Sequence, residues 1–194
     1  MSKFFCFIFI LSLTGFSVSA QTVDKTVEKI RAVYNETAEK ARLAEEDGDG
    51  GQYGDLVMNE LVINKRHHQW RAVGIYELAY KFFYRGGDSE AHLYPDELVL
   101  VKVQKRISSR TYAEELLYDK TGALIFYFQK AEGAGGDAEI PAERRVYFSL
   151  GKAVRIIEDD KKRDKLTVKD AAAVKEIMQD SIRIKDIFTK SIKL

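Results

Sequence analysis

The stretch QWRAVGIYELAYKFFYR, residues 69–85, decides the fold. In its second half every other side chain is aromatic or leucine, in the order Tyr76, Leu78, Tyr80, Phe82 and Tyr84. Successive side chains of an extended chain point to opposite faces, so this period of two predicts a strand with one apolar face. We therefore expect residues 69–85 to form one long strand.

Other runs with strand character surround this stretch, at residues 55–64, 97–107, 111–118, 123–130, 143–149 and 153–158. Several of the links are short and turn-like, at residues 65–68, 108–110, 119–122 and 150–152. Short links join antiparallel neighbours, because a parallel pair needs a crossover of about a dozen residues or more. Residues 86–96 and 132–142 contain glycine pairs, acids and the prolines, which predicts exposed loops. The pattern indicates a curved antiparallel meander of six or seven strands.

A helix is expected at each end of this meander. Residues 22–46 carry apolar side chains every three or four positions, and glycines follow in residues 47–51. Thr167 and Asp170 form a helix-start box, and one apolar stripe follows it: Val174, Ile177, Met178, Ser181, Ile184 and Phe188. The expected fold class is therefore α+β, with an N-terminal helix, the meander and a C-terminal helix.

The first 20 residues have the pattern of a signal peptide. Lys3 supplies the positive start, residues 4–13 form an apolar run, and Ala20 ends a group of small residues that a signal peptidase reads. The run is shorter than the roughly 20 residues of a transmembrane segment. We expect a signal peptide over residues 1–20, a single domain over residues 21–194, and export to the periplasm or the cell exterior.

The composition limits the classes of partner. The chain has 31 Lys and Arg against 30 Asp and Glu, and loss of Lys3 with the leader leaves 30 of each sign. A formal charge of zero argues against nucleic acid or an anionic membrane as the main partner. The single cysteine, Cys6, lies in the leader, so we expect no disulfide and no sulfur-ligated metal in the mature domain.

Three histidines are the first candidate metal ligands. His67 and His68 are adjacent, and His92 follows in a predicted loop. A metal site needs three or four convergent ligands, whereas neighbours on an extended chain diverge. We interpret the pair as part of a solvated basic turn.

An acidic, glycine-rich segment suggests calcium. Asp47, Asp49 and Asp55 are spaced as loose ligands, but the glycine position of the calcium loop holds Gln52 and the closing glutamate position holds Met58. Loose calcium binding is the alternative to a plain turn. The sequence predicts no metal site and no cofactor.

No catalytic pattern emerges. The glycine-flanked setting of a nucleophile elbow is missing at Ser89, Ser108, Ser109 and Ser149. Adjacent carboxylates such as Glu114 and Glu115 are weak signs of an acid–base pair. We therefore expect a protein that is not an enzyme.

The sheet itself offers a candidate binding surface. In residues 123–129 the pattern places Leu124, Phe126 and Phe128 on one face and Ile125 and Tyr127 on the other, so both faces are apolar. One interpretation is that the two helices cover both faces. The other is an open aromatic surface for a peptide, a glycan or an apolar ligand, formed by Tyr76, Tyr80, Phe82, Tyr84 and Tyr127.

Basic residues are also unevenly placed. Between residues 65 and 110 they outnumber acids, and Lys102, Arg106 and Arg110 are candidates for an anion-binding patch. The alternative is that strands of opposite charge simply pair across the sheet.

Several segments carry a resemblance. They are Ile30-Arg31-Ala32-Val33-Tyr34, Tyr94-Pro95-Asp96-Glu97-Leu98, Tyr112-Ala113-Glu114-Glu115-Leu116-Leu117-Tyr118 and Leu124-Ile125-Phe126-Tyr127-Phe128. With the leader, they make the chain look like a group of uncharacterised secreted proteins of Gram-negative gut-type bacteria, a group that brings no established activity. The element order alone is similar to that of periplasmic lipid carriers, which is a weak argument for function.

Three functional hypotheses follow. The first is an exported, non-enzymatic binding or interaction domain that uses the aromatic sheet face. The second is a periplasmic carrier that holds an apolar ligand such as a lipid between sheet and helices. The third is a hydrolase, which requires one of the histidines to lie in a pocket beside an acid or a nucleophile.

Overall fold

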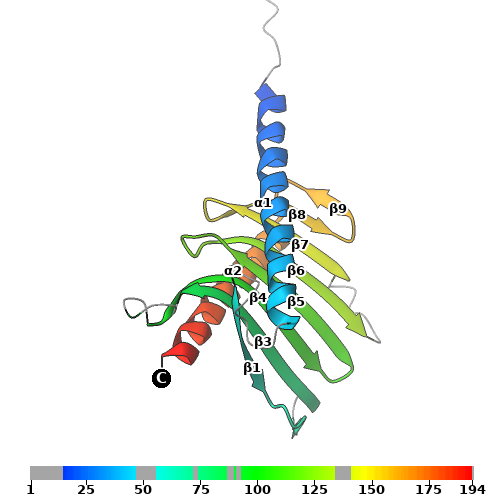
Figure 1. The fold of residues 1–194 in the computed structure, drawn as a ribbon. Coiled ribbons are helices and arrows are strands. Elements are labelled where there is room, and N and C mark those ends of the chain that lie inside the picture. The colour runs from blue at the N-terminus through cyan, green and yellow to red at the C-terminus, as the bar shows by residue number, and fades with distance from the viewer. Residues whose placement is uncertain are drawn as a thin grey trace, which may run out of the picture.

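Two helices cover opposite faces of one antiparallel sheet (Figure 1). The computed structural model describes residues 15–46, 56–71, 74–86, 90, 93–133 and 141–193. Helix α1 spans Gly15–Glu46 and helix α2 spans Val168–Ile192. The strands of the described residues are β1 (Val57–Ile63), β2 (Gln69–Trp70), β3 (Gly74–Gly86), β4 (Pro95–Ile107), β5 (Arg110–Tyr118), β6 (Leu124–Gly133), β7 (Glu143–Ser149), β8 (Lys152–Glu158) and β9 (Lys161–Arg163).

The sheet is a meander. The strand order is β1-β3-β4-β5-β6-β7-β8-β9, with β2 paired to β3, and every pair is antiparallel. Each strand therefore pairs with a close neighbour in sequence, as the short links predict. The α+β class, the two terminal helices and the curved antiparallel sheet are confirmed.

The number of strands is higher than expected. Residues 69–85 do not form one strand, because Gly74 has a φ of 75° and β2 folds back to pair with β3. A positive φ costs glycine little and interrupts an extended strand. A second unexpected strand, β9, pairs with β8 after a turn in which Asp159 and Asp160 also have positive φ. The described residues thus form a sheet of nine strands rather than six or seven.

Irregular pairing changes which side chains share a face. The register shifts between Leu117 and Tyr118, so that Leu117 pairs with Phe126 and Tyr118 with Leu124. Ile125 and Phe126 therefore both pack on the α1 side, whereas Leu124 and Tyr127 pack on the α2 side. The strict alternation expected for this strand is wrong at Leu124 and Ile125, because a bulge adds one residue to one strand.

Helix α1 is held to the sheet at three points along its length. Asp24 lies 2.7 Å from Arg155, the Tyr34 hydroxyl donates to Glu115 over 2.7 Å, and Glu45 lies 2.7 Å from Lys102. Between these contacts Val27, Ile30, Ala41 and Ala44 are buried in the core cluster on this face.

Helix α2 begins at the expected box. The Thr167 hydroxyl accepts from the backbone of Asp170, and the Asp170 carboxylate accepts from the backbone of Thr167. The expected stripe faces the sheet, where Ile177, Ile184 and Phe188 are buried. Neither helix of the described part of the chain is both long and apolar enough to cross a membrane.

Candidate anion-binding pocket

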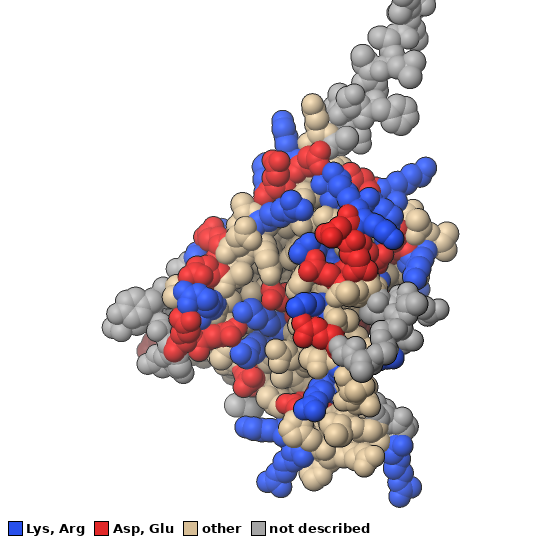
Figure 2. All heavy atoms as spheres, turned by 90° about the vertical axis from the view of Figure 1, so that its right-hand side faces the viewer, with Lys and Arg blue, Asp and Glu red and all other residues tan. Residues whose placement is uncertain are grey.

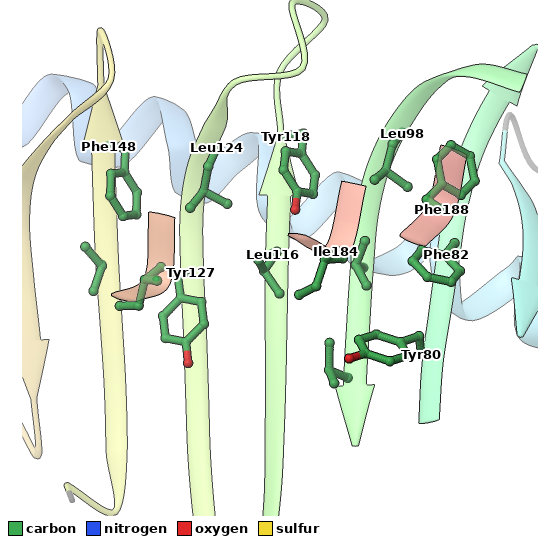
Figure 3. Packing of buried hydrophobic residues seen from close by; sticks show 14 of the residues in the cluster. Tyr80, Phe82, Leu98, Leu116, Tyr118, Leu124, Tyr127, Phe148, Ile184 and Phe188 are labelled. Atoms are coloured by element: carbon green, nitrogen blue, oxygen red, sulfur yellow. The ribbon is translucent and has the colours of Figure 1, made fainter. Parts of the chain in front are cut away.

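The predicted aromatic surface lies beneath α2 (Figure 3). Tyr80, Phe82, Tyr84 and Tyr127 keep between 1 and 6% of their surface exposed. The ring of Phe188 lies 5.4 Å from the rings of both Phe82 and Tyr84. The structure brings these side chains together as core, so the expectation of an open surface is wrong, and the alternative that helices cover both faces is confirmed.

Tyr76, at the end of the same row, is only half-buried. Its ring lies 5.6 Å from the ring of Trp70, which is exposed. Tyr76 therefore belongs to the margin of the core rather than to a binding surface continuous with Tyr80.

The candidate patch of Lys102, Arg106 and Arg110 is divided. The ammonium of Lys102 lies under the C-terminal end of α1 and pairs with Glu45. Arg106 is exposed four residues further along β4, and Arg110 opens β5. Because Lys102 is engaged within the protein, the three side chains do not form one open patch.

The candidate metal ligands also separate. His67 and His68 lie on an exposed turn, where the Nδ1 of His67 is 2.8 Å from Glu77. His92 and the acidic segment with Asp47, Asp49 and Asp55 lie outside the described residues. Within the described ranges, no three His, Cys, Asp or Glu side chains converge as metal ligands would.

The structure forms a different candidate site between α1 and the middle of the sheet. Its volume is about 300 Å³, and it is lined by Arg31, Tyr34, Asn35, Phe126, Arg145 and Tyr147. The α1 residues lie three and four positions apart, so they share one helix face. Arg145 and Tyr147 alternate on β7, and Phe126 of β6 is the direct partner of Tyr147.

Aromatic rings form the wall of this pocket on the sheet side. The ring centroids of Tyr34 and Phe126 are 4.7 Å apart, and those of Phe126 and Tyr147 are 5.0 Å apart. Both pairs are tilted, a geometry that aromatic rings favour. Phe126 and Tyr147 are buried, so the aromatic wall is held by the core.

Arg31 and Arg145 supply the charge. The Nε of Arg31 donates to the Tyr147 hydroxyl over 3.0 Å, and its guanidinium lies 5.5 Å from the centre of that ring. Arg145 lies 5.7 Å from the ring of Phe128 and pairs with Glu143, both side chains being about one third exposed. No carboxylate of the described residues pairs with Arg31, and no carboxylate lines the pocket.

The two phenols differ in their bonding. The Tyr34 hydroxyl donates to Glu115, and burial, with the Glu115 carboxylate, raises the pKa of Tyr34 well above its usual value. The Tyr147 hydroxyl accepts from Arg31, which leaves its own proton available to a ligand. Arg31, Arg145, Asn35 and Tyr147 can thus all donate hydrogen bonds into one space with an aromatic wall.

A larger cleft lies at the C-terminal end of α2. It has a volume of about 490 Å³, and its lining includes Lys120, Lys185 and Lys193 but also Glu97 and Asp119. The Nζ of Lys185 already donates to the carbonyl oxygen of Gly122 over 2.6 Å. Its charges are mixed, so it favours no one class of ligand as clearly as the pocket beside α1 does.

Sequence reasoning missed the pocket. The sequence pattern places Arg31 and Tyr34 on an amphipathic helix and Arg145 and Tyr147 on a strand, and it does not bring the two elements together. The sequence signal for the pocket is that an arginine and a tyrosine share one face of α1 and one face of β7. It becomes meaningful only when the fold places α1 across β7.

Comparison of the chain with protein-family models, with curated proteins and with solved structures found no match.

Proposed function

We propose that this protein is an exported, non-enzymatic binding domain that takes a small organic acid in the pocket beside α1. The ligand class is a carboxylate attached to a flat apolar body. The observation that supports this ligand class is the composition of the lining. Two arginines, Arg31 and Arg145, lie beside an aromatic wall, and no carboxylate lines the pocket.

The chemistry of the lining supports this ligand class. A guanidinium binds a carboxylate through two parallel hydrogen bonds, and such charge-assisted bonds are about twice as strong as neutral ones. The Tyr147 hydroxyl proton and the Asn35 amide lie in the same lining. The rings of Tyr34, Phe126 and Tyr147 would contact the apolar body. A volume of about 300 Å³ suits a ligand of one or two rings.

Helix α1 begins at Gly15, before the predicted cleavage site after Ala20, so it is longer than the helix expected over residues 22–46. Val23 packs against the core cluster and Asp24 lies 2.7 Å from Arg155, and both residues follow Ala20. Cleavage after Ala20 would therefore leave every pocket residue in the mature protein. We propose the periplasm or the cell exterior as the location of the protein.

We propose a binding role over a hydrolytic one because the described residues that line the pocket include no Ser, Thr, Cys, His, Lys, Asp or Glu. A hydrolase needs a nucleophile or a general base beside its substrate. His67 and His68 lie on an exposed turn rather than in this pocket.

Isothermal titration calorimetry with benzoate and benzamide tests the proposal. The two compounds have nearly the same shape, and only benzoate is charged. We expect benzoate to bind at least about tenfold more tightly, and Arg31→Ala and Arg145→Ala each to weaken its binding by about tenfold or more.

Arg42→Ala is the matched control. Arg42 also lies on α1 but pairs with Glu39 and Glu46 at the surface, away from the pocket lining. Its loss should leave benzoate binding unchanged. Equal affinity for benzoate and benzamide, or equal effects of Arg31→Ala and Arg42→Ala, would contradict the proposal.

A further inference from the structure

The turn that joins β1 to β3 projects from one end of the sheet, past the C-terminal end of α1 (Figure 1). We call its described residues, 63–71 and 74–76, the hairpin tip. Asn64 orders this tip, since its side chain bonds to the backbone of His68 and of Tyr76. The backbone of Ser108, in the next turn, donates to Ile75 over 2.7 Å. Hydrogen bonds therefore order the hairpin tip and join it to the neighbouring turn at Ser108.

The charge of the tip is positive. The sequence from residue 63 to residue 76 contains Lys65, Arg66 and Arg71 and no Asp or Glu. All three cations are exposed. Glu77, the first acid after this stretch, lies 2.8 Å from His67. In Figure 2 the lowest part of the molecule shows Lys and Arg around uncharged residues, without Asp or Glu.

The same tip exposes large apolar side chains. Trp70 is 56% exposed, Ile75 40% and Ile63 38%. The Trp70 ring lies against Tyr76 at 5.6 Å, a contact that holds it at the surface. Tryptophan beside lysine and arginine is the combination that proteins use at the boundary between lipid headgroups and acyl chains.

We propose that the hairpin tip docks on a bilayer that contains anionic lipid. Trp70, Ile75 and Ile63 would enter the headgroup region, while Lys65, Arg66 and Arg71 would contact lipid phosphates. The formal charge of zero expected for residues 21–194 is a sum over the whole domain, and it does not describe this local excess of positive charge. The inference is independent of the pocket beside α1.

The shape and composition of the tip favour a bilayer over nucleic acid. A projecting tip can enter a lipid interface, whereas single-stranded nucleic acid is bound by a positive groove that follows its backbone. Exposed isoleucines gain from leaving water at a bilayer surface. Contact with the phosphates of a nucleic acid alone would leave these apolar side chains in water.

The chain supplies its own probe, because Trp70 is its single tryptophan. The purified protein is mixed with vesicles of phosphatidylcholine alone or with 30% phosphatidylglycerol, and Trp70 emission is recorded together with co-sedimentation. We expect a shift to shorter wavelength and co-sedimentation only with the anionic vesicles. Both signals should weaken in 0.5 M salt, because screening shortens the reach of charges.

Variants locate the contact. Lys65→Glu, Arg66→Glu and Arg71→Glu together should lower vesicle binding by at least about a hundredfold, since each cation contributes to attraction at an anionic surface. The control reverses the exposed Lys152, Lys161 and Lys169, which lie on β8, on β9 and at the start of α2. It makes the same change in net charge and should bind far more tightly than the tip variant. Far-UV circular dichroism establishes whether both variants fold. If the triple glutamate variant of the tip does not fold, the milder variant with Lys65→Gln, Arg66→Gln and Arg71→Gln replaces it.

Three results would overturn this inference. One is equal binding to the two kinds of vesicle, and another is equal loss in the tip and control variants. The third is absence of vesicle binding, including the case in which the protein binds a short DNA duplex instead.

Discussion

The Nε of Arg31 donates a hydrogen bond to the hydroxyl of Tyr147 over 3.0 Å, which joins α1 to β7 at the proposed pocket. Tyr147 is 1% exposed, so its hydroxyl orients Arg31 from a fixed position. Because the core holds the Tyr147 ring, this hydrogen bond also fixes the orientation of the Arg31 guanidinium at the pocket.

Tyr147→Phe tests this connection. The ring stays in the core, but Arg31 loses its acceptor and a ligand loses a donor. We expect the free energy of unfolding to fall by about 1 kcal/mol and benzoate binding to weaken by about fivefold or more. Chemical denaturation and calorimetry measure the two effects. A variant with reduced stability and unchanged binding would show that the Tyr147 hydroxyl has no part in the site.

Arg155→Ala should destabilise the attachment of α1. The Arg155 side chain is 5% exposed and forms two hydrogen bonds with Asp164, in addition to its contact with Asp24. Loss of the guanidinium leaves Asp164 without this partner, and we expect unfolding to require about 2 kcal/mol less free energy. Arg42→Ala, which removes only exposed ion pairs, is expected to leave stability unchanged in the same denaturation experiment.

Acid should weaken the start of α2. The Arg163 guanidinium, together with bonds from Thr167, lowers the pKa of Asp170 from 3.8 to about 2. A lowered pKa stabilises the fold fully above pH 3.8, and this contribution is lost as the pH falls towards 2. Asp170→Asn should therefore lose about 2 kcal/mol at pH 7 and depend less on pH between 5 and 2. Parallel pH profiles for variant and wild type would show that Asp170 does not carry this dependence.

Phe188→Ala tests whether α2 stays packed on the sheet or can move away from it. Phe188 is 4% exposed and packs between Phe82 and Tyr84. Loss of a buried phenylalanine costs about 3 kcal/mol or more, and thermal unfolding should show a corresponding decrease. Val168→Ala, at a side chain that is 90% exposed, is the control. Unchanged stability in Phe188→Ala would favour the carrier hypothesis, in which α2 leaves the sheet to admit an apolar ligand.

Much of the fold could be predicted from local patterns. The alternation from Tyr76 to Tyr84 indicates a strand, the short links indicate antiparallel pairing, and Thr167 with Asp170 marks the start of α2. These features depend on residues close together in sequence, so one sequence contains the information that they need.

The errors arise where the backbone departs from regular geometry. Gly74 interrupts what reads as one strand, and the register shift at Leu117 exchanges the faces expected for Leu124 and Ile125. The sequence pattern does not predict β9, because its residues are charged and lack apolar alternation, and because the strand pairs with β8 through the turn at Asp159 and Asp160.

The pocket needs information that no local pattern contains. Arg31 and Tyr147 are 116 residues apart, and only the position of α1 across the sheet brings them together. The same holds for the burial of Phe82, since an apolar row in a strand does not show that a helix 106 positions later will cover it with Phe188.

Backbone amide chemical shifts recorded during a titration with benzoate test the central claim most directly. We predict saturable changes at Arg31, Tyr34 and Asn35 of α1 and at Arg145 and Tyr147 of β7, with none at Gly122 or Lys185 in the larger cleft. Changes confined to Gly122 and Lys185, or no changes at any concentration of benzoate, would contradict the assignment of the pocket.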